Sequence, residues 1–479
     1  MSNLKKGLSV VAVAVIGAAV IGPKVVGSQL ESTLKAQVEK LNETAGYNAE
    51  LLEFESSWFS TSAKVSLTLD LETSTGNTPT DDQDALESID TVIDLSAQHG
   101  PLLFNDIATL GWLSLTASVD GKSVSDHIVT ENNQAFYTLQ NHMTLFGSHS
   151  FQDNIAPLVF DCTDCEQPIK ITYDGYQGGG EVSSNNMVYK GMGGNTLFNM
   201  TNGELKLGEL KMDFAGEVPL EQLFSMGLYN SNAKIVLNSV NFSKVGETDS
   251  IEFKGIGINT DTKLNSEKEL ATMVVGYELE SFTDGDIEGK DFDIEFEFTN
   301  IDNNFLNEYE TFLNQVAEAD AELAELERIQ SEFMNTHVLA LVKANPHMNL
   351  TKFNGTLTQG SFTGNVNSEL VNIEAMPEMI ADPKFWLTHT QADGKFLVDK
   401  PLASYFAKMM IASQIRKNPQ AQGMPEAQIQ EIASAQSGTF LNSLIQQGII
   451  VELESQFEST ISLKDLQLLV NDQQIPLPY

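Results

Sequence analysis

The segment Asp291–Phe298 reads DFDIEFEF, and its alternation of acidic and apolar residues decides how the chain folds. Because successive side chains of a β-strand point to opposite faces of a sheet, one face of this segment is acidic and the other is apolar. Such strands are typical of antiparallel sheets with one face packed and one face solvated. The segment therefore predicts a half-buried antiparallel strand.

The same alternation recurs along much of the chain. It is found in Tyr47–Leu71, Leu113–Val119, Gly203–Phe214, Lys234–Phe242, Ile251–Ile258, Met273–Leu279, Asn349–Phe362 and Gln456–Leu469. Many strands joined by short turns predict large antiparallel sheets. With 479 residues the chain is too long for a single compact core, so either several domains or one elongated sheet is expected.

Three helical blocks interrupt the strands. In Ile301–Ala344, apolar residues alternate by four and three, which is a heptad pattern. We expect one long helix that lays this stripe on a sheet; the alternative is a coiled coil that makes a homodimer. The blocks Leu402–Lys417 and Pro425–Gln447 predict a helical pair, and Pro401 suits the first turn of the former.

The N-terminus predicts a membrane helix. Lys5 and Lys6 are followed by Gly7–Gly22, a run without a charged residue. If Lys24 snorkels, the apolar segment reaches the ~20 residues that a bilayer requires. A cleaved signal peptide is the alternative, but helical periodicity continues through Gly27–Asn42, which favours a retained anchor. The positive-inside rule then places the lysines in the cytoplasm and the rest of the chain outside.

Together these patterns predict an α+β fold. A transmembrane helix leads into an elongated body of long antiparallel β-sheets with helices packed on one face. The expected regions are a cytoplasmic tip and anchor at 1–27, a juxtamembrane helix at 28–46, a first β-rich region at 47–300, and a long helix with a second sheet and helix region at 301–479.

Charge narrows the classes of function. The chain has 66 Asp and Glu against 27 Lys and Arg, a formal charge of −39. An excess of this size repels phosphate backbones and anionic headgroups, which argues against nucleic acid as a partner and against attachment to an anionic lipid surface. No metal-ligand spacing of histidines, nucleophile elbow, phosphate-binding loop or dinucleotide fingerprint occurs. We therefore expect no cofactor and no enzymatic activity.

Cys162 and Cys165 are the only cysteines. In an oxidising compartment they predict a short-range disulfide that fixes a turn. Redox exchange is the alternative, but a reactive thiol needs a lowered pKa. The neighbouring Asp161, Asp164 and Glu166 would raise it, so a structural disulfide is favoured.

An acidic segment resembles a calcium-binding loop. The first, third, fifth, sixth and twelfth places of such a loop are taken by Asp284, Asp286, Glu288, Gly289 and Glu295. Against this, Glu occupies the fifth place and the flanks read as strands, whereas the loop normally joins two helices. The favoured interpretation is a turn followed by an acidic strand face.

Three further segments carry a family resemblance. They are Trp58, Phe59 and Ser60 at the head of a strand, His99, Gly100 and Pro101 before the next strands, and the C-terminal ISLKDLQLLVNDQQIPL of Ile461–Leu477. Together they resemble the YdgA-like family of Gram-negative envelope proteins, a family of unknown function. The final turn reads Asn471-Asp472 where Asn-Gly is typical of that family.

The resemblance implies a protein of the bacterial inner membrane with a cytoplasmic N-terminus, a periplasmic body and no known catalytic residues. From the residues alone, Trp58 and Phe59 are expected to pack against the juxtamembrane helix or the first sheet, and His99 to hydrogen-bond the backbone rather than act in catalysis.

The expected function is a non-enzymatic binding or scaffolding module of the envelope that holds a lipid or another apolar ligand. An apolar groove along a long sheet would resemble the envelope lipid carriers of the AsmA type in general plan only. Two alternatives are a dimeric structural or regulatory protein that contacts envelope proteins through Ile301–Ala344, and an enzyme with dispersed catalytic residues.

Overall fold

The chain forms two compact units. The structure, a computed structural model, describes residues 30–42, 47–69, 89–104, 108–163, 165, 168–183, 185–217, 227–246, 250–265, 267, 269–318, 323–377, 380, 382–418 and 423–477. Unit 1 comprises residues 1–223 and 233–250, and unit 2 comprises 224–232 and 251–479. The division falls near residue 250 rather than at residue 300, where the sequence patterns place it.

Unit 1 contains two runs of antiparallel strands. The first runs β1 (Tyr47–Ser56), β2 (Ser60–Leu69), β3 (Ile89–His99), β6 (Leu113–Val119), β8 (Tyr137–Met143), β9 (His149–Ile155), β12 (Tyr176–Val182), β13 (Met187–Gly193) and β16 (Leu210–Gly216). The second runs β7 (Ile128–Thr130), β10 (Leu158–Cys162), β11 (Ile169–Tyr173), β14 (Thr196–Met200), β15 (Gly203–Leu207) and β17 (Ser231–Lys244).

Smaller elements complete unit 1. They are the helix α2 (Leu30–Asn42), the hairpin of β4 (Leu102–Phe104) with β5 (Ala108–Leu110), the short helix α4 (Gly121–Val124) and the 3₁₀ turn η2 (Glu131–Asn133). The helix predicted at 28–46 therefore occurs as α2.

The core of unit 1 follows from the alternation. Every second residue of β6, from Leu113 to Val119, is buried. Leu30 and Leu34 of α2 join the same cluster, as does Phe160 from the second run of strands. The two runs and α2 therefore bury their apolar faces in one core.

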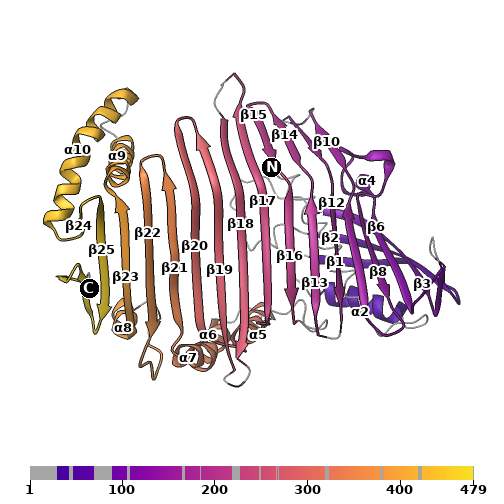
Figure 1. Cartoon of the computed structure of the whole chain (residues 1–479). Coiled ribbons are helices and arrows are strands. Elements are labelled where there is room, and N and C mark those ends of the chain that lie inside the picture. Colours follow the sequence, from indigo (N-terminus) through magenta and orange to yellow (C-terminus); the bar gives the residue numbers. More distant parts are fainter. Residues whose placement is uncertain are drawn as a thin grey trace. The chain divides into compact units, whose positions relative to one another are not determined.

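Unit 2 is built on a run of antiparallel strands, whose long members lie side by side in Figure 1. The order is β18 (Ser250–Asn265), β19 (Leu270–Asp284), β20 (Ile287–Asp302), β21 (His347–Leu357), β22 (Gly360–Leu370), β23 (Thr390–Asp399), β25 (Gln456–Lys464), β26 (Gln467–Val470) and β27 (Gln473–Ile475). The short β24 (Val451–Glu452) also pairs with β25. The quoted segment Asp291–Phe298 lies in β20, as predicted.

The helices of unit 2 do not form a layer over one face. α5 (Phe305–Glu318), α6 (Leu323–Phe333), the π-turn η4 (Met334–Val338), α7 (Leu339–Lys343) and α8 (Pro383–His389) lie where the strands end in Figure 1. α9 (Lys400–Lys417) lies against β22, β23 and β25, with α10 (Glu426–Gln446) packed on it, whereas α7 contacts β20 and α8 contacts β23. The predicted helical pair is thus present, and the predicted helical layer is wrong.

The predicted long helix over Ile301–Ala344 is also wrong. The rings of Phe312 in α5 and Phe333 in α6 stack with centroids 4.5 Å apart. In a continuous helix, residues 312 and 333 would be about 30 Å apart at ~1.5 Å per residue. The chain therefore folds back between the two helices, and the aromatic side of the heptad stripe packs within unit 2. Phe305 and Tyr309 also contact the Phe333 ring.

The fold class needs a further correction. None of the described helices has the length and apolar character needed to cross a membrane. The expected span at Gly7–Gly22 lies outside the described residues. The described part of the chain is predominantly antiparallel β-sheet, without the transmembrane helix and the helical layer of the expected α+β fold, so the single-pass, signal-anchor interpretation is withdrawn.

Candidate functional site: an apolar cavity and an aromatic ladder

An open cavity of about 500 Å³ lies in unit 2 between the sheet and the helices α9 and α10. Nearly all of its lining is apolar: the side chains are Phe353, Phe362, Phe396, Leu397, Val398, Ala403, Phe406, Ala407, Met410, Phe440, Leu441, Leu444, Ile450 and Phe457, with Thr363, Glu458 and Ser459. Ligand sites for drug-sized molecules have volumes of about 300–1,000 Å³ and mostly apolar walls. The cavity therefore has the size and lining of a site for an apolar ligand.

The chain builds this cavity with a short connection. β23 ends at Asp399 and α9 begins at Lys400, with Pro401 in its first turn as the sequence predicts. Ala403 and Ala407 are buried on the side of α9 that faces Leu441 of α10. Phe406 and Met410, by contrast, line the cavity and remain 44% and 40% exposed. The small alanines of α9 allow close packing against α10, and the larger Phe406 and Met410 lie at the open side of the cavity.

An ion pair fixes the far end of the helical pair. The Arg416 guanidinium at the end of α9 bonds both carboxylate oxygens of Glu426 at the start of α10. The hydrogen bonds from Arg416 and Gln430 lower the pKa of Glu426 to about 2. Because these side chains are exposed, the ion pair contributes little to stability; its main effect is to orient the connection between α9 and α10.

A ladder of phenylalanines leads across the sheet to the cavity. The rings of Phe253, Phe282, Phe292, Phe362, Phe353 and Phe396 follow one another at centroid distances of 6.1, 5.6, 6.2, 5.0 and 6.3 Å. These spacings fall in the range of favourable aromatic pairs. We call this set the aromatic ladder. Its last three members line the cavity, so the apolar surface continues from β18 to β23.

Glycines make room for the rings. Gly364 lies opposite Phe396 in the β22–β23 pairing, and a Cβ at this position would collide with the Phe396 ring. Gly289 and Gly355 likewise lie so close to the rings of Phe282 and Phe292 that a side chain would displace them. Glycine in a strand often marks such a close approach. Gly289 and Gly355 are buried, whereas Gly364 and the phenylalanines of the ladder are half-buried.

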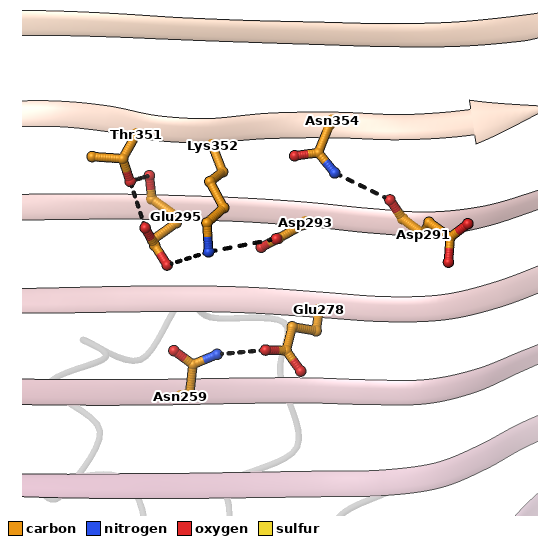
Figure 2. A network of polar contacts seen from close by, with 8 residues as sticks. All are labelled: Asn259, Glu278, Asp291, Asp293, Glu295, Thr351, Lys352 and Asn354. Carbon is orange, nitrogen blue, oxygen red and sulfur yellow. Dashed lines mark hydrogen bonds and ion pairs between the residues drawn. The ribbon is translucent and has the colours of Figure 1, made fainter.

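The opposite face of the sheet is polar (Figure 2). Lys352 on β21 bonds Glu295 at 2.8 Å and lies 3.8 Å from Asp293. The hydrogen bond from Lys352 lowers the pKa of Glu295, and the same bond raises the pKa of Lys352. On the neighbouring strands, the Asn259 amide donates to Glu278 at 3.0 Å. On the predicted acidic face of the β20 segment, Asp293 and Glu295 are therefore paired with Lys352, and the apolar surface lies on the reverse face.

The calcium-loop residues do not come together. Asp284 ends β19 and pairs with Ile287 at the start of β20, so Asp284, Asp286 and Glu288 lie at a hairpin turn, where Gly285 has φ 57°. Glu295 lies eight residues beyond Ile287 along the strand, about 26 Å away at ~3.3 Å per residue. Lys352 and Thr351 bond it there. The geometry matches the turn and acidic strand that the sequence favours.

Cys162 and Cys165 are bonded to each other in unit 1, with their Cα atoms 5.4 Å apart. Cys162 belongs to the buried core. His127 lies nearby, and its Nδ1 is 3.0 Å from the carbonyl oxygen of Asp161. The pair closes the turn after β10.

The first two family-motif segments, around Trp58 and His99, lie at one edge of unit 1. Trp58 and Phe59 form the β1–β2 turn and are 92% and 65% exposed, so the expected packing against the helix or sheet is wrong. His99 is buried, and its Nε2 lies 3.1 Å from Thr61 Oγ1, a side chain rather than the expected backbone group. Burial lowers the pKa of His99. Gly100 is required because a Cβ would overlap the backbone of Gly111.

A second group of buried polar residues lies in unit 1. The Tyr189 hydroxyl donates to both oxygens of Asp153 at 3.2 Å and contacts the Tyr176 hydroxyl. Burial raises the pKa of Asp153. These groups come from β9, β12 and β13, and the sequence patterns did not identify them, because they become neighbours only through strand pairing.

The geometry defines a class: antiparallel β-sheet proteins with an apolar, open cavity between sheet and helices. The chain belongs to the bacterial protein family of unknown function DUF945, whose pattern matches residues 4–478. A family of unknown function was expected from the sequence, and the match covers nearly the whole chain. Comparison with curated proteins and with solved structures finds no significant match.

Proposed function

We propose that this protein is a non-enzymatic binding module that holds the acyl chain of a lipid or another long apolar molecule in unit 2. The observation that carries the proposal is the continuity of the aromatic ladder with the cavity: Phe353, Phe362 and Phe396 belong to both. Burial of apolar surface is worth about 25 cal/mol per Å², so a long chain lying on this surface gains affinity without polar recognition.

The lining supports binding rather than catalysis. Glu458 is the one ionisable residue among the lining side chains, and it bonds Lys395 at 2.7 Å. A general acid or base needs a free ionisable group within reach of the substrate. The cavity walls therefore favour a ligand that is held and released unchanged.

The proposed place of action is the bacterial envelope, outside the cytoplasm. The bonded pair Cys162–Cys165 supports this, since disulfides persist in oxidising compartments and are rare in the cytosol. Trapping free thiols in intact cells tests it: the two cysteines should be labelled only after reduction. Labelling without reduction would contradict an envelope location.

Native mass spectrometry of the full chain tests the ligand. A mass increment that disappears after delipidation and returns with added long-chain fatty acid is expected. A chain that carries no increment and accepts none would contradict the proposal. Because the sheet does not depend on the ligand, circular dichroism should be unchanged by delipidation.

A further inference from the structure

The exposed apolar side chains of unit 1 gather at turns. Trp58, Phe59 and Phe146 are 92%, 65% and 98% exposed, and Leu102, Leu110 and Trp112 are exposed beside them. Exposed aromatic groups of this size are unusual on a soluble surface when they form one patch. We call these residues the aromatic edge.

Pairing in the first run of strands brings these turns together. Ser60 pairs with Gln98, and the row continues from His99 to Leu113, Met143 and His149. The β1–β2 turn, the end of β3, the start of β6 and the β8–β9 turn therefore all project from the same edge. Backbone hydrogen bonds join them: His99 N–H donates to Phe59 O at 2.8 Å, and Trp112 N–H donates to Met143 O at 2.9 Å.

The described turns of the edge carry no charged side chain and are partly rigid; Asp106, between β4 and β5, lies outside the described residues. The described residues of its turns, 57–60, 100–104, 108–112 and 144–148, contain no Asp, Glu, Lys or Arg, although 19% of the chain is charged. The Trp112 indole N–H donates to Leu145 O at 3.1 Å and fixes the ring. In a chain of charge −39, this is a place where a surface can approach without electrostatic repulsion.

The helix α2 begins near the same edge. Leu30 and Leu34 lie against Thr61 and Ala97, whereas Asn42 at the other end of the helix bonds Ala49. Thr61 and Ala97 pair with each other directly beside the β1–β2 turn. Leu30, where α2 begins, therefore lies on the side of the aromatic edge.

We propose that the aromatic edge docks on a zwitterionic lipid bilayer, with Trp58, Phe59 and Phe146 in the headgroup region. Trp is enriched at membrane–water interfaces because its ring is amphipathic, and apolar side chains on an uncharged rim add buried area. The excess negative charge elsewhere on the chain selects against strongly anionic surfaces. The inference concerns unit 1 and does not depend on the cavity of unit 2.

Tryptophan fluorescence of the full chain tests the docking. The double variant Trp112→Phe with Trp386→Phe leaves Trp58 as the only reporter. Trp58→Phe with Trp112→Phe leaves Trp386 of α8 as the matched control. With vesicles of phosphatidylcholine brominated in the acyl chains, Trp58 emission should shift to the blue and be quenched, and Trp386 emission should not.

This design separates docking from any other attachment. If the chain co-floats with vesicles while Trp58 emission stays unchanged, or does not bind vesicles at all, the proposal is overturned. A blue shift that depends on protein concentration without lipid would instead assign the edge to a second copy, and would also overturn it.

A second set of variants tests the apolar contribution. Phe59→Ser with Phe146→Ser should weaken vesicle binding, or the quenching of Trp58, by about tenfold or more, since each ring loses its burial. Val129→Ser with Val245→Ser removes exposed apolar groups elsewhere in unit 1 and should change neither. Equal loss in both pairs would contradict docking through the edge.

Discussion

Gly364 shows how single residues shape the apolar surface of unit 2. It gives the Phe396 ring its place, and the ring in turn forms part of the cavity wall. The sequence reveals the alternation of β20 but not this relation, because a glycine and the ring that covers it lie on different strands. His99 is similar: its place before Gly100 and Pro101 is visible in the sequence, whereas its contact with Thr61 depends on strand pairing.

Gly364→Ala should destabilise the protein by about 1–3 kcal/mol, because the new methyl group forces the Phe396 ring away. Gly438→Ala is the matched control: this glycine lies within α10, and nothing lies within 4 Å of its Cβ position. The control should stabilise the helix by about 0.5–1 kcal/mol. Denaturant unfolding measures both; equal effects would refute the packing of Gly364 against the ring.

Stability should fall as the pH falls below 6.5 because of His99 and His149. Burial lowers the pKa of both residues from 6.5 in the folded state, so the unfolded chain binds more protons in this range. Their contribution is therefore present above pH 6.5 and is lost as the pH falls through the folded pKa values. The variant His99→Gln with His149→Gln should show a smaller decrease between pH 7 and pH 5; an unchanged decrease would contradict the assignment.

At the scale of elements, sequence periodicity predicts strands well and helix partners poorly. The strand in Asp291–Phe298 and the helical pair α9 and α10 were predicted because one face of each is apolar. The heptad stripe of Ile301–Ala344 is equally compatible with packing on a sheet, on a second chain or on a later part of the same segment. The structure shows packing within the segment, because Phe312 of α5 stacks on Phe333 of α6. The sequence between α5 and α6 contains no proline to mark a helix end or start, as Pro346 and Pro401 do elsewhere.

Phe312→Asp should lower the free energy of unfolding by up to about 3 kcal/mol without changing the oligomeric state, because the ring packs within the chain. Leu313→Asp is the control, since Leu313 is 38% exposed and should tolerate the change. Denaturant unfolding with size-exclusion chromatography distinguishes the interpretations. A Phe312→Asp protein that keeps its stability but elutes as a smaller species would support a coiled coil instead.

At the scale of the whole molecule, the alternation of acidic and apolar residues gives the unit 2 sheet one polar face and one apolar face. The charged side chains around Lys352 lie on one face of the unit 2 sheet, and the aromatic ladder lies on the other face. Composition predicts that nucleic acid is not a partner, but it cannot locate a cavity whose lining residues run from Phe353 to Ser459. The candidate site required the fold, because its residues become neighbours only through strand pairing and the packing of α9 and α10.

The most direct measurement is the affinity of the full chain for a fluorescent long-chain fatty acid. Ala407→Phe fills the cavity from the buried side of α9, and Ala435→Phe places the same ring on an exposed position of α10 as the control. Binding should weaken at least about tenfold in Ala407→Phe, equivalent to ~1.4 kcal/mol, and stay unchanged in Ala435→Phe, with both proteins folded by circular dichroism. Unchanged binding by a folded Ala407→Phe protein, or no binding by the unmodified chain, would contradict the account.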